Sequence, residues 1–435
     1  MMTGVGVQTL TGRMKSSSSG SITDLEPDRT NGRKQLRILI VTPSLPYPLI
    51  WGFGIRVYQF VRLLARHHRV SLLTYAERDD AEKVAAVESL GTTVHTVPRK
   101  RGIERGKRLA QLSSIFSRLS YQRRSLYSRG MQAKLDELLS QERFDVIQIE
   151  SSQLAGFEFD QQTVLIVDEH NIEYELLYRM CQTERSTARR LYNWLEFTKF
   201  RREEIRTWQD VSGCVSTSVR EEAIIQQIAP RTPTVVVPNA VDVAYFAPTN
   251  EFTDVNAIVM TGMMHYRPNI DGALYFLQEI FPQILASRPN MVFYIVGAGA
   301  PDELKRLAGA NVVVTGTVPD VRMYVQRSAV FVVPLRMGGG TRLKVLEGLA
   351  MEKAVVSTSV GCEGIDVRNL EHLLIADEPR AFADSVLTLL SDRELAARLG
   401  RQGRALVERQ YRWETVVDRL EGFYGQLLTS AARAF

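Results

Sequence analysis

The feature that most constrains the fold lies between residues 329 and 358. A run of apolar, β-branched residues at 329–335 is followed by three glycines at 338–340, by leucines at helical spacing, and by a second apolar run from residue 354. Strand, glycine turn, helix and strand in this order are typical of a parallel α/β unit, because parallel strands need a long crossover connection. We therefore expect an α/β fold.

The start of this helix carries charges that do not suit it. We expect Thr341 to be the N-cap, so that Arg342 and Lys344 lie in the first turn, where each cation opposes the helix dipole by roughly 0.3–1 kcal/mol. A bound anion would remove this conflict, since free N–H groups beside glycines form a ready phosphate site. Glu347, deeper in the helix, could accept hydrogen bonds from a sugar diol. The alternative is that both cations are solvated and that Lys344 pairs with Glu347.

The rest of the chain shows the same alternation in two series. A strand at 37–43 leads through a proline-rich loop into a helix, and further short apolar runs follow. We interpret 235–252 as a linker, after which a second series runs from 257 to 375. Two such units facing each other suit a nucleotide and a second substrate. We expect a flexible tail at 1–36, two Rossmann-like units with parallel sheets at 37–245 and 246–410, and a closing helix at 411–435.

Two places in the first series are candidates for ligand contact. Gly52, Gly54 and Arg56 occupy the first strand-to-helix turn, where doubly wound folds bind ligands, although glycines in loops are commonly turn residues only. His170 follows a predicted strand end, and a histidine there is either functional or structural. We interpret the aromatic residues of the helix predicted at 186–208, Trp194 among them, as packing residues.

Composition excludes several classes of protein. The 435 residues are 45% apolar, enough for the cores of two or three domains, and the net charge of +5 suits an anionic partner. The three cysteines lie far apart, which predicts neither a disulfide framework nor structural zinc, and no His/Asp cluster has metal-ligand spacing. The sequence shows no nucleic-acid-binding module, no secretory signal and no apolar stretch of about 20 residues. We expect a cytoplasmic protein.

A basic segment at 99–130 leaves a membrane role open. Ten Lys or Arg residues in it accompany one acidic residue, Glu104. Apolar residues are interleaved with these charges: Leu109, Leu112, Ile115, Phe116 and Leu119. Such a segment can bind an anionic membrane surface, here the inner face of the plasma membrane. The alternative is a solvated helix whose apolar side packs on the domain.

Five motifs together resemble the retaining glycosyltransferases of family 4, which have the GT-B fold of two facing Rossmann-like domains. They are PNAVDVAYF, TGMMHYRPNIDGALYFLQEIFP, GTVPDVRMYV, MGGGTRLKVLEGLAMEKAVVSTSVGCEGI and YRWETVVDRLEGFY. The GGGTRLKVLE part is similar to one subgroup, and the first half matches most clearly at GFGIRVYQFVRLLARHHRV. The resemblance covers residues 37 to 428. It implies transfer of a sugar from a nucleotide-diphosphate sugar to a sugar or lipid-linked acceptor, in cell-surface polysaccharide or glycolipid synthesis.

The resemblance also implies roles for single residues. The implied catalytic residues are Lys344, Arg267 and His170. The implied donor-binding residues are Gly52, Gly54, Gly262, Val318, Gly338, Gly339, Gly340, Thr341, Arg342, Leu343 and Glu347. Lys344 and Arg267 would neutralise the donor diphosphate, and His170 would lie near the transferred sugar or the acceptor. These cations would do the work of a metal ion, so neither a metal nor a cofactor is expected.

The chain departs from the family pattern at two positions. Gly339 stands where the first glutamate of the Glu-x7-Glu motif is expected, and Glu347 matches the second. The loop MMHYRPN offers Arg267 but lacks the expected lysine. These departures keep two alternatives open, which are a nucleotide-sugar-binding scaffold protein without transfer activity and a GT-B-like sugar epimerase.

Overall fold

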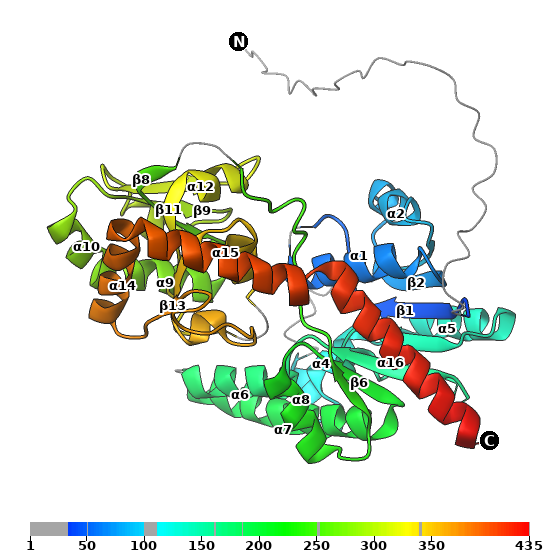
Figure 1. Ribbon diagram of the computed structural model, residues 1–435. Helices are drawn as coiled ribbons and strands as arrows, with labels where there is room; N and C mark the ends of the chain where they lie inside the picture. Colours follow the sequence, from blue (N-terminus) through cyan, green and yellow to red (C-terminus); the bar gives the residue numbers. More distant parts are fainter. Residues whose placement is uncertain are drawn as a thin grey trace, which may run out of the picture. The chain divides into compact units, whose positions relative to one another are not determined.

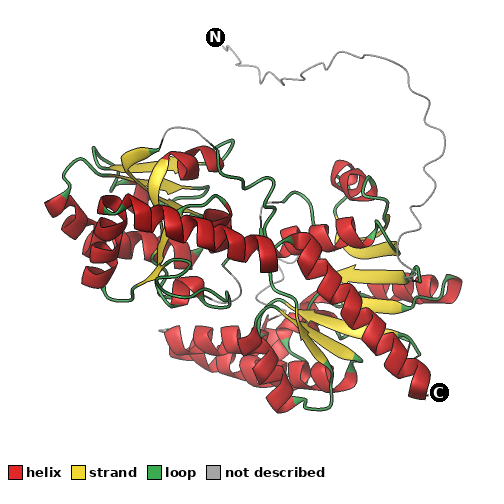
Figure 2. Ribbon diagram, viewed as in Figure 1, coloured by secondary structure: helices red, strands yellow, loops and turns green. Residues whose placement is uncertain are grey.

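The structure is a computed structural model that describes residues 34–49, 51–99, 111–160, 162–184, 186–249, 253–338 and 342–434. Within the compact unit that begins at Leu36 it contains two parallel sheets flanked by helices (Figures 1 and 2). The predicted α/β class with two Rossmann-like sheets is therefore confirmed. All but the last three residues of the tail expected at 1–36 lie outside the described residues.

The first sheet has seven parallel strands in the order β3-β2-β1-β4-β5-β6-β7. They are β1 (Arg37–Thr42), β2 (Arg69–Ala76), β3 (Thr93–Pro98), β4 (Val146–Ile149), β5 (Val164–Glu169), β6 (Gly213–Ser216) and β7 (Thr234–Val236). The connecting helices are α1 (Gly52–Leu64), α2 (Ala81–Glu88), α4 (Tyr121–Leu126), α5 (Arg129–Gln141), η1 (Ser152–Leu154), α6 (Glu173–Thr183), α7 (Thr187–Asp210) and α8 (Val219–Ile228).

The second sheet has six parallel strands in the order β10-β9-β8-β11-β12-β13. They are β8 (Asp254–Thr261), β9 (Val292–Val296), β10 (Val312–Gly316), β11 (Ser328–Val333), β12 (Ala354–Ser357) and β13 (Leu374–Ile375). The helices are α9 (Arg267–Tyr275), the π-helical turn η2 (Phe276–Ile280), α10 (Phe281–Ser287), α11 (Asp302–Lys305), α12 (Arg322–Arg327), α13 (Leu343–Ala350), η3 (Val360–Cys362), α14 (Pro379–Ser391), α15 (Arg393–Gln410) and α16 (Trp413–Ala434).

In each sheet the order of the strands reverses beside the strand that comes first in the chain. β1 lies between β2 and β4, and β8 lies between β9 and β11. Ligands of doubly wound sheets bind beyond the carboxyl ends of the strands at such a point. The turns that follow β1, β4, β8 and β11 are therefore the places where a site is expected.

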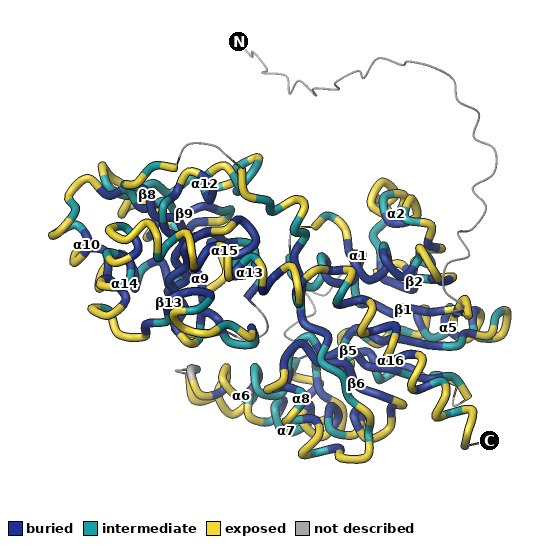
Figure 3. The backbone as a smooth tube through the Cα atoms, viewed as in Figure 1, coloured by how far each residue is buried: buried dark blue, intermediate teal, exposed yellow. Residues whose placement is uncertain are grey.

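The strands are buried because both faces of each sheet are covered. Ile38 and Ile40 of β1 belong to one buried cluster, whereas Leu39 and Val41 belong to another on the opposite face, as the two-residue period of a strand requires. The second sheet has one large buried cluster of its own. Figure 3 shows the strands as largely buried and the outer surfaces of the helices as exposed. Both sheets are thus rigid supports for the turns at their ends.

Helix α16 follows the second sheet in the sequence but packs on the first. Leu420 and Phe423 of α16 lie in the same buried cluster as Val57 and Phe60 of α1. Gly213 of β6 makes room for the helix, since a Cβ there would lie 2.7 Å from the Phe423 ring. The last helix therefore covers one face of the first sheet (Figure 1, red).

Two local expectations from the sequence are wrong. Helix α13 begins at Leu343 with Arg342 in the N-cap position and without a side-chain cap, one residue later than an N-cap at Thr341 implies. Trp194 of α7 is 50% exposed rather than packed, although Phe200 of the same helix is fully buried.

The basic segment turns its apolar side outward where it is described, at residue 99 and from 111 to 130. Phe116 is 92% exposed, and Leu112, Ile115 and Leu119 are exposed as well. Ser114 faces α7 instead and donates a hydrogen bond to Glu196 at 2.9 Å. The alternative that the apolar side packs on the domain is therefore wrong for these four residues. Leu109 lies outside the described residues. No helix in the described ranges is long and apolar enough to cross a bilayer.

Candidate functional site

A cavity of about 470 Å³ lies where the strand order of the first sheet reverses. One wall comes from residues after β1, β4 and β5, including Ser44, Glu150 and His170. The other wall includes Tyr266 and Leu343, which precede or begin helices of the second sheet. The cavity is therefore lined from both series of strands, and the fold delivers most of its polar groups at strand ends.

Several helices begin at this cavity. Gly52 starts α1, Glu173 starts α6 and Leu343 starts α13, and Tyr266 is the N-cap residue of α9. A Cβ on Gly52 would lie 3.3 Å from Cδ1 of Leu343, so the starts of α1 and α13 are close together. Because helix N-termini carry partial positive charge and free N–H groups, their convergence favours an anionic ligand.

On the side of the first sheet, four charged or titratable side chains interact directly. The guanidinium of Arg56 binds both carboxylate oxygens of Asp168, with Nε–Oδ2 at 2.8 Å and Nη2–Oδ1 at 2.9 Å. Both residues are fully buried. Nε2 of His170 lies 2.9 Å from Oε2 of Glu150 and 3.8 Å from Oδ2 of Asp168. The imidazole therefore meets two carboxylates, one of which is neutralised by Arg56.

Glu150 has a second partner that leads away from the cavity. Nε2 of Gln148 donates to Oε1 of Glu150 at 2.7 Å, and the hydroxyl of Tyr424 on α16 donates to Oε1 of Gln148. Burial raises the pKa of Glu150, and the hydrogen bond from His170 opposes this effect. Helix α16 is thus connected to His170 through two buried side chains.

The expectation that no His/Asp cluster has metal-ligand spacing is wrong for the folded chain. Ligand atoms of Glu150, Asp168 and His170 lie within 4.8 Å of one another. Both oxygens of Asp168 already accept from Arg56, and Glu150 accepts from Gln148 and faces His170. A cation could use this cluster only by displacing these donors, so the arrangement fits an ion-pair network better than a metal site.

On the side of the second sheet, the ammonium of Lys344 lies against the turn that follows β8. Its Nζ donates to Oδ1 of Asn269 at 2.6 Å, and Nδ2 of Asn269 donates to the carbonyl of Met263. Gly262 has φ +149°, and a Cβ there would lie 2.8 Å from Nζ. Burial lowers the pKa of Lys344 to about 8. Glycine at 262 therefore leaves the space that the ammonium occupies.

Two further predicted residues support this side of the site. Glu347 lies one turn after Lys344, and burial raises its pKa to about 7 while the lysine opposes the shift. Gly338 has φ +140°, and a Cβ there would lie 2.8 Å from the guanidinium of Arg342. Burial lowers the pKa of Arg342, with Glu363 opposing. Arg342 therefore packs against Gly338, the first of the three glycines.

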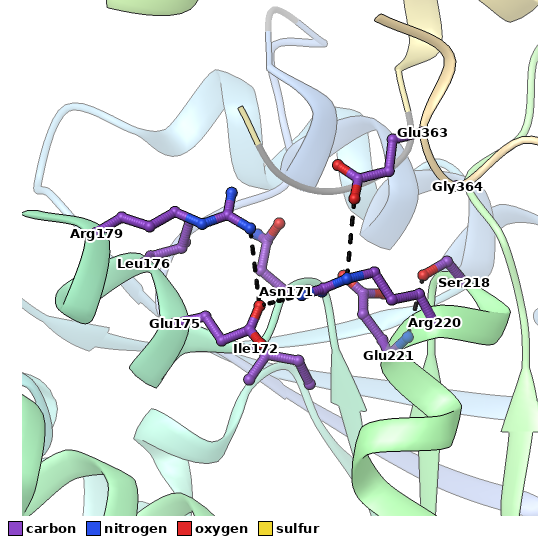
Figure 4. A pocket seen from close by; sticks show the side chains of 10 residues that line it. All are labelled: Asn171, Ile172, Glu175, Leu176, Arg179, Ser218, Arg220, Glu221, Glu363 and Gly364. Atoms are coloured by element: carbon purple, nitrogen blue, oxygen red, sulfur yellow. Dashed lines mark hydrogen bonds and ion pairs between the residues drawn. The ribbon is translucent and has the colours of Figure 1, made fainter. Parts of the chain in front are cut away.

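A smaller pocket beside the cavity contains contacts between helices of the first sheet and loops of the second (Figure 4). Arg220 of α8 lies 2.7 Å from Glu175 of α6 and 3.8 Å from Glu363. Nη1 of Arg179 donates to the carbonyl of Gly338 at 2.9 Å. These partly exposed contacts connect α6 and α8 to the ends of the strands in the second sheet.

The structure brings some of the predicted residues together and leaves others apart. Gly52, His170 and Leu343 line one cavity, and Gly54 packs against the indole of Trp51 within α1. Arg267 begins α9 but is exposed and makes no hydrogen bond or ion pair within the described ranges, and Val318 packs on the second core away from the cavity lining. Residues 339–341, and with them Gly339, Gly340 and Thr341, lie outside the described residues.

Sequence reasoning missed three residues that the site depends on, and it did not foresee the ion pair of a fourth, Arg56. Glu150 and Asp168 stand at the ends of apolar runs, and this position is a usable signal because strand ends meet at one edge of a parallel sheet. Arg56 was placed only within a weak glycine motif. Asn269 follows the proline of the loop MMHYRPN and gives no signal until its contact with Lys344 is seen.

Two family models match the chain. Residues 52–240 match the model described as a glycosyl transferase 4-like domain, and residues 255–392 match the model described as glycosyl transferases group 1. The first match covers strands of the first sheet, and the second match covers strands of the second. The two halves of the chain are thus matched separately and in order.

Individual proteins that resemble the chain share less than 30% of their residues with it. An uncharacterised 44.6 kDa protein in the cps region of Klebsiella pneumoniae is 22% identical over 370 residues, covering 81% of this chain and 90% of that protein. A GDP-mannose-dependent monoacylated alpha-(1-6)-phosphatidylinositol monomannoside mannosyltransferase of Corynebacterium glutamicum is 28% identical over 221 residues, which are 42% of this chain and 54% of that protein. The chain spans about half the length of this second relative.

Solved structures share the fold at low identity. Sucrose-phosphate synthase from Thermosynechococcus elongatus gives a TM-score of 0.64 at 17% identity. The match covers 91% of this chain and 100% of that one. Anabaena HepE in complex with UDP gives a TM-score of 0.63 at 13% identity over 90% of this chain and 100% of that one. At these identities the likeness concerns the fold alone.

Proposed function

We propose that this chain, a glycosyltransferase of the family 4 type with the GT-B fold, moves a sugar from a nucleotide-diphosphate sugar to a hydroxyl of a sugar or lipid-linked acceptor. The transfer retains configuration and needs no metal ion. In this proposal residues 37–245 take the acceptor, residues 246–410 hold the donor, and residues 411–435 close the fold. The product enters a cell-surface polysaccharide or glycolipid made on the cytoplasmic side of the membrane.

The observation that supports this function most strongly is the environment of Lys344. Its ammonium lies at the start of α13, where the helix dipole disfavours a cation, and its partner among the described residues is a neutral amide oxygen. Burial disfavours its charge further, as its lowered pKa indicates. A diphosphate would neutralise the ammonium and accept from the free N–H groups of the same helix.

The chemistry that we propose follows from charge. Departure of a nucleotide diphosphate builds negative charge on the leaving phosphate, and preorganised cations and N–H groups stabilise it as it forms. In this proposal Lys344 and the N-terminus of α13 supply these groups on the donor side, and the exposed side chain of Arg267, at the start of α9, turns towards the phosphates to assist. His170 and Glu150 line the cavity on the acceptor side, where a hydroxyl would lie.

The test is calorimetric binding of UDP, GDP and ADP to the wild type and to Lys344→Ala. We expect one nucleotide to bind and the substitution to weaken it by about 10- to 100-fold, the effect of losing a charge-assisted contact. Lys305→Ala on α11 is the matched control, because Lys305 is an exposed lysine paired with Asp302 and does not line the cavity. Equal affinity in wild type and Lys344→Ala would contradict the proposed phosphate site.

Binding and transfer must be measured separately, because a nucleotide-sugar-binding scaffold would show the first without the second. A donor that matches the bound nucleotide is supplied with a panel of neutral glycosides and lipid-linked sugars. Transfer to any of them supports the enzyme. Tight nucleotide binding without transfer or donor hydrolysis across the panel favours the scaffold.

We further propose that the segment 111–130 contacts an anionic membrane surface that presents the acceptor. Leu112, Ile115, Phe116 and Leu119 recur at helical spacing and are all exposed, next to Arg118. An exposed apolar group bordered by cations fits the boundary between lipid head groups and acyl chains.

Co-sedimentation with vesicles tests this membrane contact. Phe116→Ser with Leu112→Ser should reduce binding to vesicles that contain phosphatidylserine, and high salt should weaken the wild type. Leu191→Ser on α7 is a control for loss of one exposed leucine outside the segment. Unchanged binding of the double variant would exclude this surface.

A further inference from the structure

We propose that Glu150 is a positioning residue for His170, and that Tyr424 of α16 holds Glu150 in place through Gln148. The carboxylate of Glu150 accepts the Nε2–H of the imidazole and thereby leaves Nδ1 as the ring nitrogen that meets a ligand. This inference rests on the proposed function for its kinetic consequences. Its structural content, the position of one proton on His170, can be measured without any substrate.

The direction of the hydrogen bonds in this chain of side chains decides where the proton lies. The phenol of Tyr424 donates to Oε1 of Gln148, so the amide nitrogen of Gln148 points to the other side. That nitrogen donates to Oε1 of Glu150 at 2.7 Å. Oε1 of Glu150 therefore accepts a hydrogen bond from Gln148, and Oε2 faces Nε2 of His170 at 2.9 Å.

Hydrogen bonds from His170 and Gln148 counteract the effect of burial on Glu150 and favour its ionised form. An ionised carboxylate only accepts hydrogen bonds, so we take Nε2 of His170 as the donor in the last contact. Nδ1 has no hydrogen-bond partner within the described ranges. A neutral ring in this tautomer offers a lone pair at Nδ1, and a lone pair suits the hydroxyl hydrogen of a sugar. The geometry thus points to a sugar hydroxyl rather than an anion as the group that His170 contacts.

The other groups around the imidazole support the same position of the proton. Oδ2 of Asp168 lies 3.8 Å from Nε2, and Arg56 binds both oxygens of Asp168. Glu173 of α6 lines the same cavity, and the ring of Phe53 from α1 lies with its centroid 4.7 Å from that of His170. The carboxylates of Glu150 and Asp168 therefore face Nε2, whereas an aromatic ring restrains the plane of the imidazole.

Nitrogen-15 NMR of the full chain with labelled histidine measures the tautomer directly. The chain has six histidines, and the spectrum of His170→Asn assigns the signal of interest by its absence. We expect protonated Nε2 and unprotonated Nδ1 in the wild type without ligand. A wild-type ring protonated at Nδ1 alone would overturn the proposal.

Glu150→Gln gives the sharper test because it is nearly isosteric. Gln148 still needs an acceptor at the first oxygen position, so the new amide nitrogen faces His170 and donates to Nε2. We expect the tautomer to switch to Nδ1–H and the turnover to fall by about 10-fold or more, with nucleotide affinity within about 2-fold of wild type. Retention of the wild-type tautomer and turnover would refute the assignment.

Tyr424→Phe keeps the test valid if Glu150→Gln does not fold. It frees the amide of Gln148 to rotate, so the wild type's single tautomer should become a mixture, with a smaller loss of turnover. Tyr75→Phe is the matched control, since it removes another buried phenol hydrogen bond, to the carbonyl of Leu126, in the same sheet. Equal spectra for Tyr424→Phe and wild type would contradict the role of α16. The spectra decide this even if no transfer activity is found.

Discussion

On the side of the first sheet, charged groups of the site meet one another. Arg56 binds Asp168 at two points, and His170 faces Glu150, all at buried or nearly buried positions. On the side of the second sheet, the hydrogen bond of a cation goes to a neutral group, and the acid that favours its charge, Glu347, lies one turn along the same helix. Lys344 donates to an amide oxygen and lies at a helix start that opposes its charge. We infer from this difference that folding completes the ion pairs of the first side, whereas the second side awaits the anionic ligand that we propose.

The largest expected effect is a difference in stability between variants of the two sides. Arg56→Met leaves the carboxylate of Asp168 buried without its guanidinium, so we expect the free energy of unfolding to fall by about 3–5 kcal/mol. Lys344→Met removes an unfavourably placed cation and should change it by less than about 1 kcal/mol in either direction. Chemical denaturation of both variants measures the contrast. Equal losses would show that the two sides do not differ in this way.

The second prediction concerns pH. The pKa of Lys344 is lowered from 10.5 to about 8, so the ammonium loses its proton as the pH rises through about 8. Nucleotide affinity should therefore fall up to about tenfold per pH unit above that value. Stability should move the other way, because between pH 8 and 10.5 the unfolded chain binds more protons than the folded one, and stability then rises with pH.

Lys344→Arg is the variant that isolates this effect. A guanidinium stays protonated throughout the range, so the affinity of this variant should be lower at neutral pH but flat up to pH 10. Calorimetric titration at several pH values compares the two proteins. A decline of the same steepness in Lys344→Arg would assign the pH dependence to another group.

The smallest predicted effect concerns the glycine turn after β8. Gly262→Ala places a Cβ 2.7 Å from Nδ2 of Asn269 and 2.8 Å from Nζ of Lys344, at a positive φ. We expect a loss of about 1–2 kcal/mol in stability and a several-fold loss of nucleotide affinity. Gly309→Ala is the control, because a Cβ there meets nothing within 4 Å. If Gly262→Ala has the same stability and nucleotide affinity as the control, the turn after β8 does not contribute to nucleotide binding.

The sequence allowed the strands and the ligand-binding edge of each sheet to be predicted, because both follow from local patterns. The apolar runs that became β1, β8 and β11 are short and β-branched, and each is followed by glycine at or before the start of the next helix. Lys344 could be singled out since its conflict with the helix dipole involves only neighbouring residues. These are properties that a window of about ten residues contains.

The contacts of the first side could not be predicted in this way. Glu150 depends on Tyr424, and Arg56 depends on Asp168, across separations that no periodicity records. The prediction that Trp194 is a packing residue was wrong for a related reason. Helical spacing shows that residues share a face but not whether another element covers that face. The domain boundaries and the roles of single residues stay predictions.

The packing of α16 on the first sheet has a consequence for the order of events during synthesis. The cluster that contains Ile38 and Phe60 is completed by Phe423, which leaves the ribosome only after the whole second sheet. A nascent chain must therefore carry an uncovered apolar face for most of its translation, a state in which chains aggregate readily or bind chaperones. Because Tyr424 arrives with the same helix, its hydrogen bond to Gln148, on which the proposed position of the proton on His170 depends, also forms only after α16 has left the ribosome.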